Sequence, residues 1–295
     1  MKAAFITTST DNCDPVVGGW SSFNETPAWV RYNEAAGSPD EDHLVPFIKD
    51  AAPDIAFYIG AAWLPGNPRP ETLERIRSLV PFVHICFDGG DAPWWPKMQE
   101  YRQARCFSRQ VNIDGAHCPT ADLTTLCPID PRPYDKHRDV FKFRRAGFAG
   151  FVGNTYRGSI INPLVQSGQL ELRHRKAGYK NHADYEEFAK WLCETRATVN
   201  TAITGTVMRR HVKGRLIEAG LAGVCVLEDG LSPAKDWFTP MVDYVPWHTV
   251  DDAATWLRTL TDSDLIRIGQ NLECKVRGSY SAKTIYQQMI KELPR

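Results

Sequence analysis

Residues 209–229 read RRHVKGRLIEAGLAGVCVLED, and they indicate the fold more directly than any other stretch of the chain. Their apolar residues predict a helix over 209–221 that leads, through small residues, into a buried strand over 224–227. A helix that runs into a short apolar strand is the repeating unit of a parallel α/β sheet. The stretch also begins with four permanent cations within seven residues, Arg209, Arg210, Lys213 and Arg215.

The same alternation extends in both directions along the chain. Strands are expected over 3–8, 54–59, 82–87, 148–152, 170–173, 197–200 and 242–245, and helices near 25–35 and over 70–79, 157–165, 184–194, 251–260, 263–276 and 281–293. Residues 14–20 are expected to form a loop. The sequence therefore predicts the α/β class, with two Rossmann-like, doubly wound domains and a helical C-terminal tail.

A proline-rich stretch suggests the domain boundaries. Residues 127–133, CPIDPRP, hold three prolines in seven residues and lead into polar and charged residues, which is typical of a linker. We therefore expect an N-terminal domain over 1–130, a linker over 131–147 and a C-terminal domain over 148–280. A final helix over 281–295 is expected to cross back to the first domain.

The composition is that of a globular protein. Of the 295 residues, 43% are apolar and 24% are charged, and 35 basic residues balance 35 acidic ones. No apolar run approaches the ~20 residues that cross a bilayer, and the first ten residues lack the apolar core of a secretory signal, so we expect a soluble, cytoplasmic protein with no membrane span. The charge is uneven, with a net of −7 over 1–130, +9 over 131–220 and −2 over 221–295. The basic middle indicates either a local anionic ligand or solvated helix faces.

Open parallel sheets bind their ligands beyond the carboxyl ends of the strands, and glycines follow two of the predicted strands. Gly18 and Gly19 come after the first strand, and Gly153 and Asn154 come after the strand over 148–152. Ordinary turns explain both pairs equally well. The sequence has no Gly-x-Gly-x-x-Gly or Walker motif, which disfavours dinucleotide dehydrogenases and P-loop NTPases.

Two aspartates follow the third predicted strand. Asp88 ends the strand over 82–87 beside two glycines, and Asp91 comes directly after them. A ligand can reach a carboxylate in such a place, so both are candidate general bases. A turn or helix-cap aspartate is the competing interpretation of Asp88.

The cations of 209–215 point to an anionic group. On a helix, His211, Arg215 and Glu218 would share one face, and Arg209 and Lys213 another. Cations at a helix N-terminus oppose the helix dipole, and a ligand phosphate would remove that repulsion and accept charge-assisted hydrogen bonds. The Glu218 carboxylate would then accept hydrogen bonds from ribose hydroxyls. The alternative is an exposed basic helix with an internal Arg215–Glu218 pair.

Several of these stretches resemble the GT-B glycosyltransferases, in particular the spore-maturation-protein-like (CgeB-like) group with a glycosyltransferase family 1-type C-terminal domain. The matching residues are 151–154 (FVGN), 213–223 (KGRLIEAGLAG) with the strand to 229, 244–247 (YVPW) and 279–281 (SYS), and more weakly 53–56 (PDIA) and 87–88 (FD). The likeness covers 148–290 well and 1–147 weakly.

The resemblance implies two Rossmann-like domains facing across a cleft, with a nucleotide-sugar donor on the second domain and an acceptor on the first. It implies that Glu218 binds the donor ribose, that Lys213 and Arg215 bind the diphosphate, and that Gly153 and Asn154 line the cleft. Gly18, Gly19 and Arg209 are further candidate donor contacts. UDP-sugar is the expected donor, with no other cofactor and no essential metal. Related retaining enzymes often carry a glutamate eight positions before the Glu218 equivalent, where this chain has Arg210, so the stereochemistry is left open.

The expected function is therefore glycosyl transfer to an unidentified acceptor, which is a glycan, a protein, a small molecule or a modified nucleobase. Nucleic acid is a possible but disfavoured acceptor. The first alternative is a nucleotide-sugar epimerase or hydrolase of the same fold. The second is a non-catalytic module that binds nucleic acid through the basic residues of 131–220.

Overall fold

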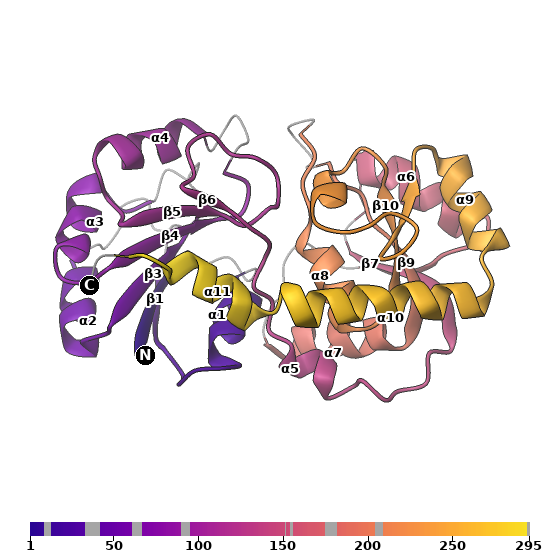
Figure 1. Ribbon diagram of the computed structural model, residues 1–295, viewed down its shortest axis with the longest axis horizontal. Coiled ribbons are helices and arrows are strands. Elements are labelled where there is room, and N and C mark those ends of the chain that lie inside the picture. The colour runs from indigo at the N-terminus through magenta and orange to yellow at the C-terminus, as the bar shows by residue number, and fades with distance from the viewer. Residues whose placement is uncertain are drawn as a thin grey trace. The chain divides into compact units, whose positions relative to one another are not determined.

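The computed structural model describes residues 1–8, 13–32, 42–60, 67–89, 95–150, 152–153, 156–174, 182–203 and 209–293. The chain divides into two compact units. The first unit consists of Met1–Asp130 together with Ala282–Arg295, and the second unit is Pro131–Ser281. Each unit is an α/β structure built on a parallel sheet (Figure 1), which confirms the predicted fold class.

The sheet of the first unit has the strand order β2-β1-β3-β4-β5-β6, and all neighbouring strands are parallel. Its strands are β1 (Ala3–Thr8), β2 (Ala28–Tyr32), β3 (Ile55–Ile59), β4 (Phe82–Cys86), β5 (Arg109–Asn112) and β6 (Leu123–Thr124). Its helices are α1 (Asp14–Ser21), α2 (Leu44–Ala51), α3 (Pro70–Arg77), α4 (Trp95–Gln103) and α11 (Ala282–Ile290).

Helices cover both faces of this sheet. Ile6 and Tyr58 lie in one buried cluster with residues of α2, α3 and α4. On the opposite face, Phe5 and Phe57 stack on each other and contact Trp20 of α1. Successive side chains of a strand point to opposite faces, so strands that are apolar at every position require helices on both sides.

The region after β1 differs from the expectation. Residues 14–20 form helix α1 rather than a loop, and residues 28–32 form strand β2 rather than part of a helix. The two glycines permit α1 to lie against the backbone before Asp130. A Cβ on Gly18 would lie 2.5 Å from Asp130 Oδ2, and one on Gly19 would lie 2.1 Å from the carbonyl oxygen of Pro128. A Gly-Gly pair is typical of a turn, but here it lies within a helix and permits close packing.

Helix α11 completes the core of the first unit, although it is the last helix of the chain (Figure 1, yellow). Tyr286 is fully buried among Trp20 and Phe57, and its hydroxyl donates to the carbonyl oxygen of Val16 at 2.7 Å. Arg109 donates to the carbonyl oxygens of residues 288 and 289, at the C-terminal end of α11. A cation in this place satisfies free helix carbonyls and complements the helix dipole.

The sheet of the second unit has the order β11-β10-β9-β7-β8 and is also parallel throughout. Its strands are β7 (Arg144–Gly150), β8 (Glu171–His174), β9 (Thr195–Val199), β10 (Cys225–Asp229) and β11 (Val245–Trp247). Its α-helices are α5 (Arg132–Asp135), α6 (Tyr156–Gln166), α7 (His182–Cys193), α8 (Gly214–Leu221), α9 (Val250–Thr259) and α10 (Asp262–Ser279).

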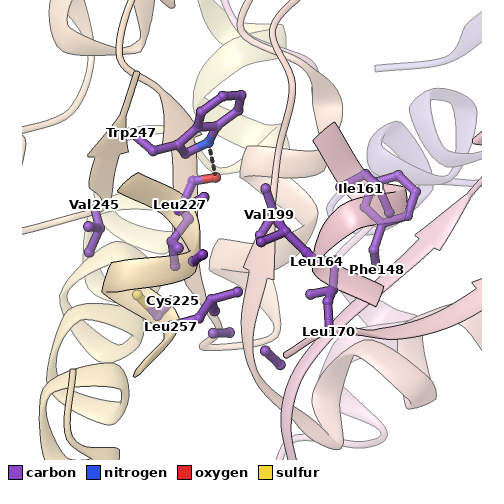
Figure 2. Close-up of a cluster of buried hydrophobic side chains, with 14 of the residues drawn as sticks. Phe148, Ile161, Leu164, Leu170, Val199, Cys225, Leu227, Val245, Trp247 and Leu257 are labelled. Carbon is purple, nitrogen blue, oxygen red and sulfur yellow. Dashed lines mark hydrogen bonds between the residues drawn. The ribbon is translucent and has the colours of Figure 1, made fainter. Parts of the chain in front are cut away.

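One face of this sheet carries the cluster shown in Figure 2. Phe148, Val199 and Leu227 of three strands lie against apolar residues of α6 and α9. The indole of Trp247 is also buried there and donates to the carbonyl oxygen of Leu227 at 3.1 Å. The core therefore joins strands that are far apart in sequence.

The segment expected to be a linker, 131–147, contains α5 and the first residues of β7, which begins at Arg144 rather than at 148. Helix α8 begins at Gly214 rather than at 209. The strand expected over 242–245 is β11, Val245–Trp247. These shifts move the ends of expected elements, whereas α5, like α2, α4, β5 and β6 of the first unit, was not expected from the sequence.

Helix α8 packs against α10 through glycines. A Cβ on Gly220 would come within 2.5 Å of Val276 Cγ2, and one on Gly269 within 2.5 Å of the carbonyl oxygen of Gly223. The absent side chains therefore set the separation of the two helices. None of the helices that the structure describes combines the length and the apolar character needed to cross a bilayer.

His84 makes the stability of the first unit depend on pH. It is fully buried in β4, stacked near Tyr58 and Phe107, and burial lowers its pKa to about 4 despite a hydrogen bond to Gln110. The unfolded chain takes up this proton near pH 6.5, so the contribution of His84 is complete above that pH and is lost as the pH falls toward 4.

We expect His84→Phe to flatten the acid side of the stability profile. Relative to the variant, the wild type should lose about 3 kcal/mol between pH 7 and 4, in line with a shift of 2–3 pKa units. Urea unfolding at a series of pH values measures this difference. His248→Gln, at an exposed histidine, should leave the profile unchanged. Parallel profiles for the wild type and His84→Phe would contradict the assignment.

Tyr286→Ala should destabilise the first unit although the residue lies near the end of the chain. Removing a fully buried ring costs about 3–5 kcal/mol, and Tyr286→Phe should cost only about 1 kcal/mol, for the lost hydrogen bond to Val16. Gln287→Ala changes the exposed neighbour and serves as the control. Denaturant unfolding that shows the same loss for Tyr286→Ala and Gln287→Ala would refute the role of α11.

Candidate functional site

The carboxyl edge of the second sheet gathers polar residues from several elements. β9 is followed by Asn200 and Thr201, and β10 ends in Glu228 and Asp229. All four residues are buried. Parallel strands place their carboxyl ends at one edge, which is where ligands of this kind of sheet bind. Buried polar residues at that edge are therefore candidate ligand contacts.

The cationic segment before α8 lies against this edge. The backbone N–H of His211 donates to the carbonyl oxygen of Ala202 at 3.0 Å, and Arg210 Nε donates to Asp229 Oδ2 at 3.3 Å. Lys213 is the N-cap of α8 and has an extended backbone. The helical faces expected for Arg209, His211 and Lys213 were wrong, because the helix begins only at Gly214. Arg209 precedes this contact and is half-buried.

Arg215 and Glu218 lie together in the first turns of α8. Arg215 Nε is 3.5 Å from Glu218 Oε2, and the guanidinium group lies 4.5 Å from the centroid of the Phe188 ring. Glu218 is 7% exposed, so the carboxylate is nearly enclosed. The structure therefore contains the internal Arg215–Glu218 pair that the sequence analysis gave as the alternative to ligand binding. A partly buried ion pair of this kind is still available to a ligand that offers better partners.

Arg157, which the sequence analysis did not select, belongs to the same group. It lies in the first turn of α6, and its Nε donates to Thr201 Oγ1 at 3.4 Å. Burial, and next the positive charge of Arg215, lower the pKa of Arg157 from its usual value. Two guanidinium groups that repel each other in a buried place are stabilised by a bound anion. The signal in the sequence was an arginine shortly after Gly153, at the start of the expected helix.

Glu228 is the second residue that the sequence analysis missed. Its side chain is fully buried at the end of β10, and Asn200 Nδ2 donates to its Oε2 at 2.6 Å. Burial raises the pKa of Glu228 to about 7, while Lys213 acts in the opposite direction. A glutamate at the end of an apolar run was the available signal. Its burial depends on elements distant in sequence.

Gly153 lies in the turn between β7 and α6, and Asn154 lies outside the described residues. A Cβ on Gly158 would come within 2.2 Å of the carbonyl oxygens of Val152 and Gly153. The backbone of Val152 and Gly153 therefore lies close to Gly158 in the first turn of α6. This close contact constrains the start of α6, where Arg157 lies. Donor binding by Gly153 stays a prediction.

In the first unit, Asp88 follows β4 at the carboxyl edge of the sheet. The neighbouring Gly89 N–H donates to Asn112 Oδ1 at 3.1 Å, and Asn112 Nδ2 donates to Asp114 Oδ1 at 2.6 Å. Carboxylate oxygens of Asp88 and Asp114 lie within 4.8 Å of each other. The sequence analysis missed Asp114. Asp91 lies outside the described residues.

Gly18 and Gly19 lie in α1 and have the packing contacts described above. Their predicted donor contact stays a prediction, as do the predicted roles of Asp88, Arg209, Lys213, Arg215 and Glu218.

Comparison with known proteins shows a likeness to one family. Residues 150–291 match the model of a family described as glycosyl transferase-like. This part of the chain is similar to that family. The match begins where β7 ends and includes the whole cationic segment, α8 and Glu228. No curated protein sequence matches the chain.

Solved structures show that the complete chain has the GT-B fold. HepE of Anabaena, solved with UDP-glucose, has a TM-score of 0.62 at 12% identity, and 99% of each chain is covered. Sucrose-phosphate synthase of Thermosynechococcus elongatus has a TM-score of 0.60 at 12% identity, with 98% of this chain and 97% of that chain covered. A UDP-N-acetylglucosamine 2-epimerase has a TM-score of 0.53 at 9% identity, with 100% and 98% covered.

These findings confirm the resemblance to GT-B glycosyltransferases. The narrower spore-maturation-protein-like assignment stays a prediction. Because the epimerase shares the fold, the architecture alone does not separate sugar transfer from chemistry on the donor alone.

The two guanidinium groups of Arg157 and Arg215 in the second unit should bind a diphosphate. Inorganic diphosphate at ten times its Kd should stabilise the wild type by about 1.4 kcal/mol, a rise of a few degrees in Tm. Arg157→Met should lose most of this rise. Arg173→Met, which removes an exposed partner of Glu187 in the same unit, should keep it. Equal shifts in both variants would contradict an anion site at Arg157.

Proposed function

We propose that the protein transfers a sugar from a nucleoside diphosphate sugar to an acceptor, with a UDP-sugar as the donor. The observation that carries the proposal is the gathering of Arg157, Arg210, Lys213 and Arg215 at the carboxyl edge of the second sheet, beside the nearly enclosed carboxylate of Glu218. The glycosyl transferase-like family covers this region, and HepE was solved with UDP-glucose, which supports the choice of donor.

The cationic groups have a chemical role in this reaction. When the bond between the sugar and the diphosphate breaks, negative charge develops on the leaving diphosphate. Fixed positive groups that stabilise this charge lower the barrier, and such electrostatic stabilisation is usually the largest contribution to catalysis. We assign this role to Arg157, Lys213 and Arg215. Glu218 accepts the ribose hydroxyls, as the resemblance implies.

We further propose that these side chains, rather than an essential metal ion, balance the charge of the diphosphate. Arginine pairs match the geometry of phosphate oxygens and keep their charge at every physiological pH. Chelator should therefore leave donor binding and turnover unchanged.

An acceptor hydroxyl must lose its proton when it attacks the sugar. Asp88, at the carboxyl edge of the first sheet, is the proposed general base for an inverting reaction, and a carboxylate oxygen of Asp114 lies within 4.8 Å of its own. Because Arg210 stands eight positions before Glu218, the chain lacks the glutamate that retaining relatives often carry there.

The first test is binding of UDP, GDP, dTDP, CDP and their sugars, measured by thermal shift with and without chelator. A uridine nucleotide at 100 times its Kd should stabilise by about 2.7 kcal/mol. Glu218→Ala should weaken UDP-glucose binding by about 10–100-fold, the cost of hydrogen bonds to a charged group, and Glu187→Ala, on the exposed face of α7, should not. Unchanged affinity in Glu218→Ala would refute the ribose contact.

Product analysis separates transfer from the alternatives. Free sugar or an isomerised nucleotide sugar, formed without an acceptor, would identify a hydrolase or an epimerase. Turnover that requires an added acceptor would support the proposal.

A further inference from the structure

Arg215 of α8 has an aromatic partner as well as an acidic one. Its guanidinium group lies over the ring of Phe188, 4.5 Å from the ring centroid, and 6.0 Å from the centroid of the Phe148 ring. Both rings are buried, and only 19% of the Arg215 side chain is exposed. An aromatic face attracts a cation, most strongly where water is excluded. The ring of Phe188, on α7, therefore stabilises Arg215 as a cation.

The contact between Arg215 and Glu218 is loose by comparison. Arg215 Nε and Glu218 Oε2 are 3.5 Å apart, whereas a good N–H···O hydrogen bond spans about 2.7–3.2 Å. An arginine and a carboxylate that approach each other freely form shorter contacts, which are frequently bidentate. The ring of Phe188 lies where it can hold the guanidinium group at this larger separation.

The two partners of Arg215 differ in what they leave for a ligand. A closely paired carboxylate would occupy N–H groups of Arg215 and its own oxygens at the same time. A phenylalanine ring has no lone pair to accept those N–H groups in a conventional hydrogen bond, so they remain available to an anion. The proposed function needs both groups, because it assigns Arg215 to the diphosphate and Glu218 to the ribose.

We propose that Phe188 is a positioning residue for donor binding, whose ring holds the guanidinium group of Arg215 ready for the diphosphate and keeps it from closing on Glu218. This inference rests on the proposed function. It assigns to an apolar core residue of α7 an effect on ligand affinity that its burial alone would not produce.

The experiment uses the full chain and two ligands, inorganic diphosphate and UDP-glucose, with affinities measured by calorimetric titration. Phe188→Leu keeps a large apolar side chain and removes the aromatic face. It should weaken the binding of both ligands about threefold to thirtyfold, the range of a cation–π contact. Leu192→Ala removes a fully buried side chain one turn later on α7 and should lower stability without weakening binding.

A double-mutant cycle separates positioning from packing. Arg215→Met should weaken diphosphate binding about tenfold to a hundredfold, through the loss of hydrogen bonds from a charged group. In that background Phe188→Leu should add little, because the guanidinium group that the ring positions is gone. A ring that acts only through the packing of α7 would cause the same loss in both backgrounds.

Equal losses from Phe188→Leu with and without Arg215, or unchanged affinity in Phe188→Leu itself, would overturn the inference and leave the proposed function standing. Wild-type affinity in Arg215→Met would overturn the inference together with the assignment of Arg215 to the diphosphate. Failure of both ligands to bind the wild type would overturn the proposed function as well. If Phe188→Leu does not fold, Phe188→Met, which also lacks an aromatic face, replaces it under the same criteria.

Discussion

The close contact between α8 and α10 is the constraint on which the candidate site depends. Gly220 and Gly269 have no side chains, so α10 can lie against α8 and against the backbone that leads into β10. Lys213 caps α8 and Arg215 and Glu218 lie within it, so the packing of α8 on α10 supports the helix that carries these residues. A bulkier residue at position 220 or 269 would push α8 and α10 apart, although it would alter no charged side chain directly.

The elements that were predicted well are those whose own residues indicate that they are buried. Strands β3 and β4 are buried at every position, because helices cover both faces of their sheet. The helix α1 was missed because Gly18 and Gly19 are typical of turns, and only the contact with the distant residues before Asp130 explains them. Arg157 and Glu228 were missed for the same reason, since each acquires its role from residues that are close only in the folded chain.

The candidate site contains groups that a stable core would exclude. A buried carboxyl group with a pKa near neutrality and two arginines that repel each other both oppose folding of the empty domain. Such departures from good local packing are expected where a ligand supplies the missing partner. The apolar cluster of the same sheet, which includes Trp247 and Leu227 (Figure 2), supplies stability that offsets these costs.

The position of α11 has a consequence for synthesis of the protein. Residues 1–130 leave the ribosome first, yet the aromatic cluster of Trp20 and Phe57 is closed only by Tyr286. At about 5–20 residues per second, the nascent first unit waits on the order of ten seconds or more, with that face of its sheet covered by α1 but not by α11, while the second unit is made. Chaperone binding in that interval would act on the N-terminal unit, although it is the first to be translated.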